Sequence, residues 1–190
     1  MNRRSVVLII GLLLASGPAS GRAFSDDKAQ DRVEISKAGK SALGALYKAQ
    51  PSARKAVESA AGYAAFSNFS MKIFLAGGGT GKGIAVNNRT KHVTYMRMAE
   101  IQAGLGWGAK KFQLVWVFED EKALNDFINT GLELGGQATA AAKAGDQGAA
   151  FQGAVAVAPG VWLYQLTDMG LALELTAKGT KYFKDQDLNS

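Results

Sequence analysis

The 190-residue chain contains no cysteine and a single histidine, His92. The lack of cysteine excludes disulfide frameworks, thiolate metal sites, cysteine nucleophiles and dithiol redox motifs. With one histidine, zinc sites built from several imidazoles and the HExxH motif of metalloproteases are excluded as well. There are only three prolines, so the composition is not that of a proline-rich linker.

Catalytic motifs are also scarce. The chain has no G-x-S-x-G nucleophile elbow, and its one acidic cluster is 119–121 (Glu-Asp-Glu). Carboxylates in that position stabilise the start of a helix, and we assign them that role. His92 lies at a predicted hairpin turn, where we expect it to be exposed, and Asp185 and Asp187 lie in a polar tail. We therefore predict a protein that is not an enzyme and holds no metal or cofactor.

The first 23 residues have the pattern of a secretory signal peptide. Arg3 and Arg4 precede an uncharged apolar run at 6–15, which is followed by small residues. Ten apolar residues are too few to cross a hydrocarbon core of ~30 Å as a helix. Gly17 stands where a bacterial lipoprotein would carry its acylated cysteine. We predict cleavage near residue 23, a mature domain at 24–190, and a periplasmic or secreted protein without a lipid anchor.

Removal of this segment changes the charge of the chain. The full sequence has 22 basic and 16 acidic residues and a net charge of +6. Arg3, Arg4 and Arg22 leave with the segment and no acid does, so the mature chain has 19 basic residues and a net charge of +3. A nucleic-acid-binding domain needs a denser basic stripe. We therefore predict no nucleic-acid partner.

Hydrophobic periodicity predicts helices first and short strands afterwards. An amphipathic helix is expected at 26–50, a second from Pro51 to Gly62, and a third with Asp120 as its N-cap and an end near Gly131. The predicted strands are short apolar runs separated by glycine or turn residues, at 63–66, 72–76, 83–86, 92–98, 101–108, 112–118, 132–144, 148–157, 161–166 and 170–177. The alanine-rich stretch 138–144 fits a helix equally well. The segment 180–183 is expected to pack back on the domain.

Glycine is unusually frequent in the chain, with 23 residues. Glycines alternate at 77, 79, 81 and 83 and again at 104, 106 and 108. Alternate residues of a strand share one face, so each run leaves a face without side chains. Such faces suit a sharp bend or the close approach of another backbone. We therefore predict an α+β fold: a strongly curled, barrel-like antiparallel sheet with about three helices, one of them seated close to the sheet.

The alternative function for the first glycine run is phosphate binding. The segment 77–83 resembles a P-loop, but Ala76 stands where the first glycine is required. Gly83 occupies the position of the Ser or Thr that reaches magnesium. We therefore predict no nucleotide partner.

Several cations fall in or beside predicted loops, and Trp107 and Phe112 flank one pair of them. These cations are Lys82, Arg89, Lys91, Lys110 and Lys111. Basic loops with aromatic neighbours can dock on an anionic bilayer, at ~1 kcal/mol per basic residue near the surface. The alternative is that they are ordinary solvated surface residues.

Taken in order, these motifs resemble the SYLF domain family, a lipid-binding domain also described as a fungal actin-binding domain. The resemblance runs from about Lys37 to Asn189 and is similar in layout to the exported bacterial branch. Ser67 replaces a proline found in many members, and no SH3 or FYVE module is present. The motifs are 60–66 (AAGYAAF), the glycine-spaced 77–86, 104–108 (GLGWG) with 112–118 (FQLVWVF), 123–127 (ALNDF), 161–166, 170–171 and 179–183 (GTKYF).

The resemblance implies binding of acidic phospholipids, which are phosphoinositides in eukaryotic members. It also implies a role for an N-terminal amphipathic helix, here 26–50, to which Lys37, Lys40 and Lys48 would add charge. Actin binding belongs to the fungal members and is not expected of an exported bacterial protein.

We therefore expect a non-enzymatic, peripheral lipid-binding protein of the bacterial envelope that recognises anionic head groups. Two alternatives stay open. One is a carrier that encloses an apolar ligand inside the curled sheet. The other is an envelope module that binds a protein partner.

Overall fold

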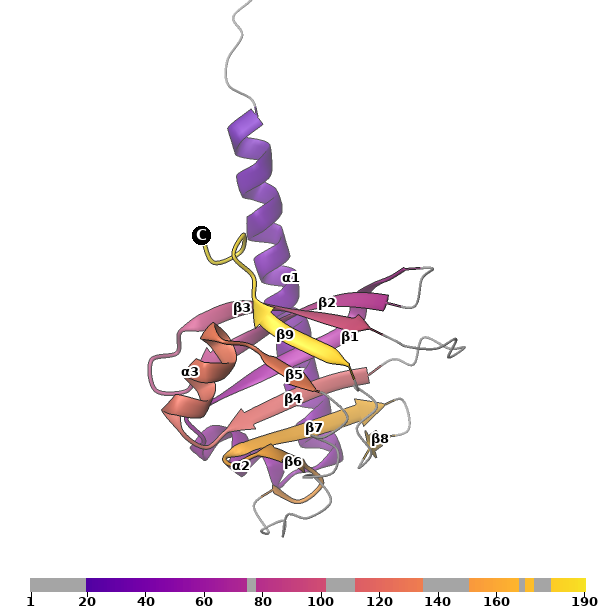
Figure 1. The fold of residues 1–190 in the computed structure, drawn as a ribbon, viewed down its shortest axis with the longest axis vertical. Helices are drawn as coiled ribbons and strands as arrows, with labels where there is room; N and C mark the ends of the chain where they lie inside the picture. Colours follow the sequence, from indigo (N-terminus) through magenta and orange to yellow (C-terminus); the bar gives the residue numbers. More distant parts are fainter. Residues whose placement is uncertain (1–19, 75–77, 102–111, 135–150, 168–169, 173–178) are drawn as a thin grey trace, which may run out of the picture.

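A computed structural model of the chain describes residues 20–74, 78–101, 112–134, 151–167, 170–172 and 179–190. Figure 1 shows how the elements are arranged. The helices are α1 (Ser20–Ala49), α2 (Ala53–Ser59) and α3 (Glu121–Asn129). The strands are β1 (Gly62–Phe74), β2 (Gly78–Asn87), β3 (Val93–Ile101), β4 (Phe112–Phe118), β5 (Leu132–Leu134), β6 (Val155–Ala158), β7 (Val161–Thr167), β8 (Gly170–Ala172) and β9 (Thr180–Lys184).

The described strands form one antiparallel sheet that is strongly curled. Their order is β5-β9-β3-β2-β1-β4-β7-β6, and β8 pairs with β7. In a flat sheet, β4 and β9 would lie about 19 Å apart, because four inter-strand spacings of ~4.8 Å separate them. The rings of Trp116 on β4 and Tyr182 on β9 are nevertheless 5.0 Å apart. The α+β fold with a curled, barrel-like sheet is therefore confirmed.

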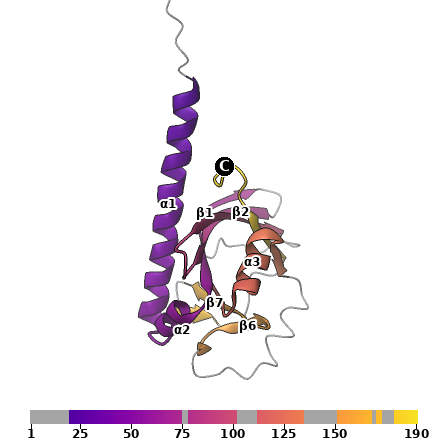
Figure 2. The same ribbon diagram turned by 90° about the vertical axis from the view of Figure 1, so that its left-hand side faces the viewer.

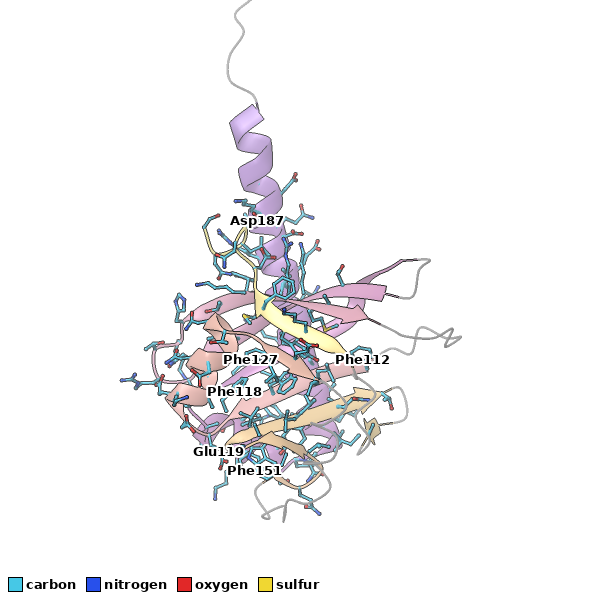
Figure 3. The ribbon with its side chains drawn as sticks, viewed as in Figure 1. Phe112, Phe118, Glu119, Phe127, Phe151 and Asp187 are labelled. Atoms are coloured by element: carbon cyan, nitrogen blue, oxygen red, sulfur yellow. The ribbon has the colours of Figure 1, made fainter. Side chains whose placement is uncertain are left out.

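Aromatic side chains fill the concave side of the sheet. Phe127 reaches in from α3, and its ring centroid lies 4.9 Å from that of Phe118 and 5.5 Å from that of Trp116 (Figure 3). Phe66 on β1 meets Tyr182 edge to face at 5.0 Å. All five residues are buried. The space inside the curl is thus occupied by the protein's own side chains.

Helices α1 and α2 cover the opposite, convex face (Figure 2). Ile35 and Leu46 of α1 are buried in one cluster with Ile84, Val115 and Val117 of the sheet. The helix comes close enough that a Cβ added at Gly39 would lie 2.7 Å from Cδ1 of Ile84. A glycine at this position is therefore what permits the close approach of α1.

The alternating glycines of β2 act on the other face. Gly83 pairs with Phe66, and a Cβ at Gly83 would meet the Phe66 ring and lie 2.5 Å from the backbone oxygen of Ala65. The predicted close approach at this run is confirmed, but it makes room for an aromatic ring and not for a helix. Gly77 and the second run, at 104–108, lie outside the described residues.

Several predicted boundaries differ from those observed. The strands expected at 63–66 and 72–76 form one strand, β1, with an irregular register between Ser67 and Lys72. The strand expected at 83–86 begins earlier, at Gly78, because its glycines pair with β1 on one side and β3 on the other. Helix α1 begins at Ser20 and not at residue 26, since no proline follows Pro18 before Pro51.

The later elements agree in type but are shorter where they are described. The strand expected at 132–144 is β5, which ends at Leu134, and the strand expected at 148–157 is β6, which begins at Val155. Strand β8 covers the start of the segment expected at 170–177. The stretches 102–108, 135–150 and 173–177 lie outside the described residues. The segment at 180–183 packs back as predicted, because β9 pairs with β3.

The two glycine environments predict opposite effects of the same substitution. Gly83→Ala should lower the free energy of unfolding by about 1–3 kcal/mol, because the new methyl group overpacks the concave core. Gly44→Ala is the matched control: Gly44 lies in α1 with no atom within 4 Å of an added Cβ, and alanine is the better helix former by ~1 kcal/mol. Chemical denaturation of both variants measures their free energies of unfolding. A Gly83→Ala variant as stable as the wild type would contradict the proposed packing.

Tyr164 on β7 predicts a dependence of stability on alkaline pH. Its side chain is fully buried, and its hydroxyl has no hydrogen-bond partner among the described residues. Burial raises its pKa from 10.0 to about 12. Because the folded state favours the protonated form, this contribution to stability is complete below pH 10 and is lost as the pH rises toward 12.

We expect Tyr164→Phe to be at least as stable as the wild type at pH 7, since it removes an unpaired buried hydroxyl that costs ~1–3 kcal/mol. Its melting temperature should also fall less steeply than that of the wild type between pH 10 and 12. Thermal denaturation across this range compares the two proteins. Clear destabilisation of the variant at pH 7 would mean that the hydroxyl has a partner.

Candidate functional site

The segment between Glu34 and Glu58 contains five cations and no acidic residue. The cations are Lys37, Lys40, Lys48, Arg54 and Lys55. The first part of α1 is different, because four of its residues between 26 and 34 are acidic. Opposite charges are therefore separated along the helix, with the positive charge toward its C-terminal end, which suits the helix dipole.

Three of these lysines lie in line on the outer face of α1. Val33, Lys37, Lys40, Gly44 and Lys48 follow one another at intervals of three or four residues, and all five are exposed. This spacing places them on one side of a helix, which is the side turned away from the sheet. Lys37 and Lys48 lie about 16 Å apart along the axis, at 1.5 Å per residue. We call these five residues the outer stripe.

The outer-stripe lysines differ from other cations in having no carboxylate partner. Among the described residues, Lys37, Lys40 and Lys48 take part in none of the ion pairs within 4.0 Å. By contrast, Lys82 pairs with Asp31 at 2.6 Å and Arg89 with Glu121 at 3.1 Å. The positive charge of the outer stripe therefore faces solvent without a neutralising acid.

Helix α2 extends this basic surface beyond the end of α1. Lys55 is exposed. The guanidinium of Arg54 lies 4.3 Å from the centroid of the Tyr47 ring and 3.4 Å from a carboxylate oxygen of Glu58. Arg54 and Lys55 are not among the residues predicted to bind lipid, although the absence of Asp and Glu from 35–57 is visible in the sequence.

Among the described residues, the predicted lipid-binding cations lie on separate elements of the structure. Lys82 lies within β2 and not in a loop, and its contact with Asp31 turns it toward α1. Arg89 and the exposed Lys91 lie in the turn between β2 and β3. Trp107, Lys110 and Lys111 fall outside the described residues. Lys37, Lys40 and Lys48 are the predicted residues that do line up.

The acidic cluster has the structural role that the sequence predicts. Asp120 caps α3 by accepting a hydrogen bond from the backbone N–H of Ala123 at 2.8 Å. Glu119 accepts one from the indole N–H of Trp162 at 3.0 Å. Glu121 pairs with Arg89. His92 is exposed beside the β2–β3 turn, as predicted.

The C-terminal segment also holds α1 in place. Arg32 of α1 donates hydrogen bonds to the backbone oxygens of Leu188 at 2.9 Å and Ser190 at 3.0 Å. Lys28 donates one to the Ser190 hydroxyl at 3.1 Å. Figure 3 shows Asp187 of this segment beside α1. The helix is thus tied to the last residues of the chain as well as to the sheet.

A buried carboxylate anchors that C-terminal segment to β3. Asp185 is 1% exposed and lies 2.7 Å from Arg97, whose pKa is raised mainly by this hydrogen bond. The other oxygen of Asp185 accepts hydrogen bonds from the backbone N–H groups of Asp187 and Leu188. A carboxylate with all these partners fixes the turn that carries residues 187–190 to α1.

In the part of the chain that the structure describes, no helix combines the length and hydropathy needed to span a bilayer. Helix α1 is long, but its outer face is charged.

Comparison with known proteins places this architecture in a family. Residues 99–190 match the model of the Ysc84 family, described as "Las17-binding protein actin regulator". A protein of Aeromonas veronii, "Beta cell expansion factor A", is 32% identical over 159 residues, which are 83% of this chain and 58% of that protein. The chain therefore spans little more than half the length of this relative. The alignment is longer than the region matched by the family model, so it extends into the N-terminal half.

The family model is described by binding and regulation and not by a reaction. The resemblance inferred from the motifs is confirmed: residues 99–190 match the model of the Ysc84, or SYLF, family, and the relative from Aeromonas veronii extends the similarity into the N-terminal half.

Proposed function

We propose that this protein binds the anionic head groups of phospholipids at the surface of a membrane, without catalysing a reaction. The observation that carries the proposal is the acid-free segment 35–57, whose five cations include the three unpaired lysines of the outer stripe. Helix α1 presents these lysines on one straight, exposed face. Such a face complements a planar negative surface.

The expected affinity is modest. Each basic residue near an anionic leaflet contributes ~1 kcal/mol, so the three lysines together contribute roughly 3 kcal/mol. This attraction falls off within the Debye length, which is ~8 Å at physiological ionic strength. The association should therefore be reversible and sensitive to salt.

The two alternatives make different demands on the structure. A carrier needs space inside the curled sheet, but Phe66, Trp116, Phe127 and their neighbours fill the described part of it. The filled interior favours binding through the outer surface of the protein over enclosure of a ligand. A protein partner with an acidic face would fit the same lysines, and the matching family is described as an actin regulator. Binding to pure lipid vesicles separates the two, because they contain no protein.

We also propose that the protein acts after export, in the periplasm or outside the cell, as residues 1–23 suggest. The test is the mass of the protein recovered from the envelope and medium of expressing cells. A mature chain that starts near Phe24 supports the proposal. Recovery of the uncleaved chain from the cytoplasm alone would contradict it.

The central prediction concerns the outer stripe. The triple variant Lys37→Gln, Lys40→Gln and Lys48→Gln should lose most of its binding to vesicles containing phosphatidylglycerol, by roughly 100-fold if each lysine contributes ~1 kcal/mol. Co-sedimentation at low and high salt measures the effect, with zwitterionic vesicles as the baseline. The melting temperature should change little, since these side chains make no ion pair with any described residue.

The matched control removes three cations that lie on elements other than α1. Lys122, Lys181 and Lys184 lie on α3 and β9, and their triple replacement by glutamine lowers the net charge by the same amount. This variant should keep most of the binding. Equal loss in both variants would mean that net charge, and not the outer stripe, determines lipid association.

A further inference from the structure

The inner face of α1 is built for close packing on the sheet. Between Ile35 and Leu46 the buried positions are small, with Gly39 and Ala42 both buried. Helices that insert into a membrane interface carry large apolar residues such as Trp, Phe and Leu on that face. A face of glycine and alanine instead lets the helix backbone approach the sheet, as it does at Ile84.

Release of α1 would leave a large apolar surface on the sheet uncovered. The residues of the sheet in the cluster under the helix include Ala65, Ile84, Val115, Val117 and Tyr164, each at most 3% exposed. A released helix could bury its own Ile35 and Leu46 in lipid. The sheet would have no such compensation.

Polar contacts at residues 31–36 also attach α1 to the rest of the domain. Lys82 of β2 binds Asp31 at 2.6 Å, and the C-terminal residues accept hydrogen bonds from Arg32. The hydroxyls of Ser36 and Tyr95 lie 3.5 Å apart. These contacts surround the region where the acidic part of α1 gives way to the basic part.

We propose that the protein binds an anionic bilayer with α1 still docked on the sheet, so that the interaction surface is the outer stripe and the inner face never enters the lipid. This inference rests on the proposed function and specifies its mode. The partner is the head-group layer of a bilayer rich in anionic phospholipid, and the helix axis lies along the membrane plane. This mode differs from that of an interfacial amphipathic helix, which binds lipid through its apolar face.

A disulfide that links α1 covalently to the sheet tests whether the protein binds lipid with α1 docked. The chain has no cysteine, so an introduced pair has no competitor. A Cβ at Gly39 would lie 3.7 Å from the Cβ of Ala65, within the ~3.5–4.5 Å that a disulfide requires. The variant Gly39→Cys and Ala65→Cys would be made together with Ile84→Ala, which removes the side-chain atoms nearest to position 39. Ile84→Ala alone is the control.

Binding of the oxidised and reduced forms to phosphatidylglycerol vesicles is then compared by co-sedimentation. The inference predicts affinities within about twofold of each other. A loss of tenfold or more on oxidation, restored by reduction, would overturn it and leave the proposed function standing. If the wild type itself failed to bind, both the inference and the proposed function would be wrong.

A second variant weakens the attachment of α1 to the C-terminal segment and needs no introduced disulfide. Arg32→Gln removes the guanidinium that donates to Leu188 and Ser190, in an otherwise native chain. If α1 binds while docked, this variant should bind vesicles no better than the wild type. A gain of threefold or more would show that release of α1 promotes binding and would overturn the inference.

Discussion

The packing of α1 across the convex face of the sheet is the constraint on which the rest of the structure depends. Gly39 lets the helix come close to Ile84, and this contact decides which face of α1 remains for a partner. Burial of Ile35 and Leu46 stabilises the docked helix by ~1.5–3 kcal/mol each, before the contribution of the sheet is counted. The roughly 3 kcal/mol available from three lysines at an anionic surface is available to the docked helix as well, so it does not favour release of α1.

The same packing gives the acidic and the basic part of α1 different surroundings. Its acidic first part lies where Lys82 and the C-terminal segment meet the helix, so Asp31 has a cation within 2.6 Å. Its basic second part has no acidic neighbour on the outer stripe. A single helix thus uses one charged region to attach itself to the domain and leaves the other for binding. The curled sheet contributes a rigid support whose interior is closed by aromatic packing.

Much of the fold could be predicted from local patterns. The cap at Asp120, the turn after Asn87 and the alternating glycines each reflect short-range chemistry, and each lies where the sequence predicts it. The site could be predicted only in part. Lys82 is predicted in or beside a loop, yet pairing of Gly78–Asn87 with β1 and β3 on both sides places it within a strand. Its partner, Asp31, lies 51 positions away, so no local pattern reveals that its charge is neutralised.

The most direct test of the account asks which face of α1 meets the membrane. An environment-sensitive fluorophore attached to Gly44→Cys would sit on the outer stripe, where an added side chain has open space. On binding to phosphatidylglycerol vesicles, the account predicts a blue shift and quenching by a spin label at the lipid head group. A helix inserted by its inner face would turn position 44 toward water. Unchanged emission from bound protein would contradict the account.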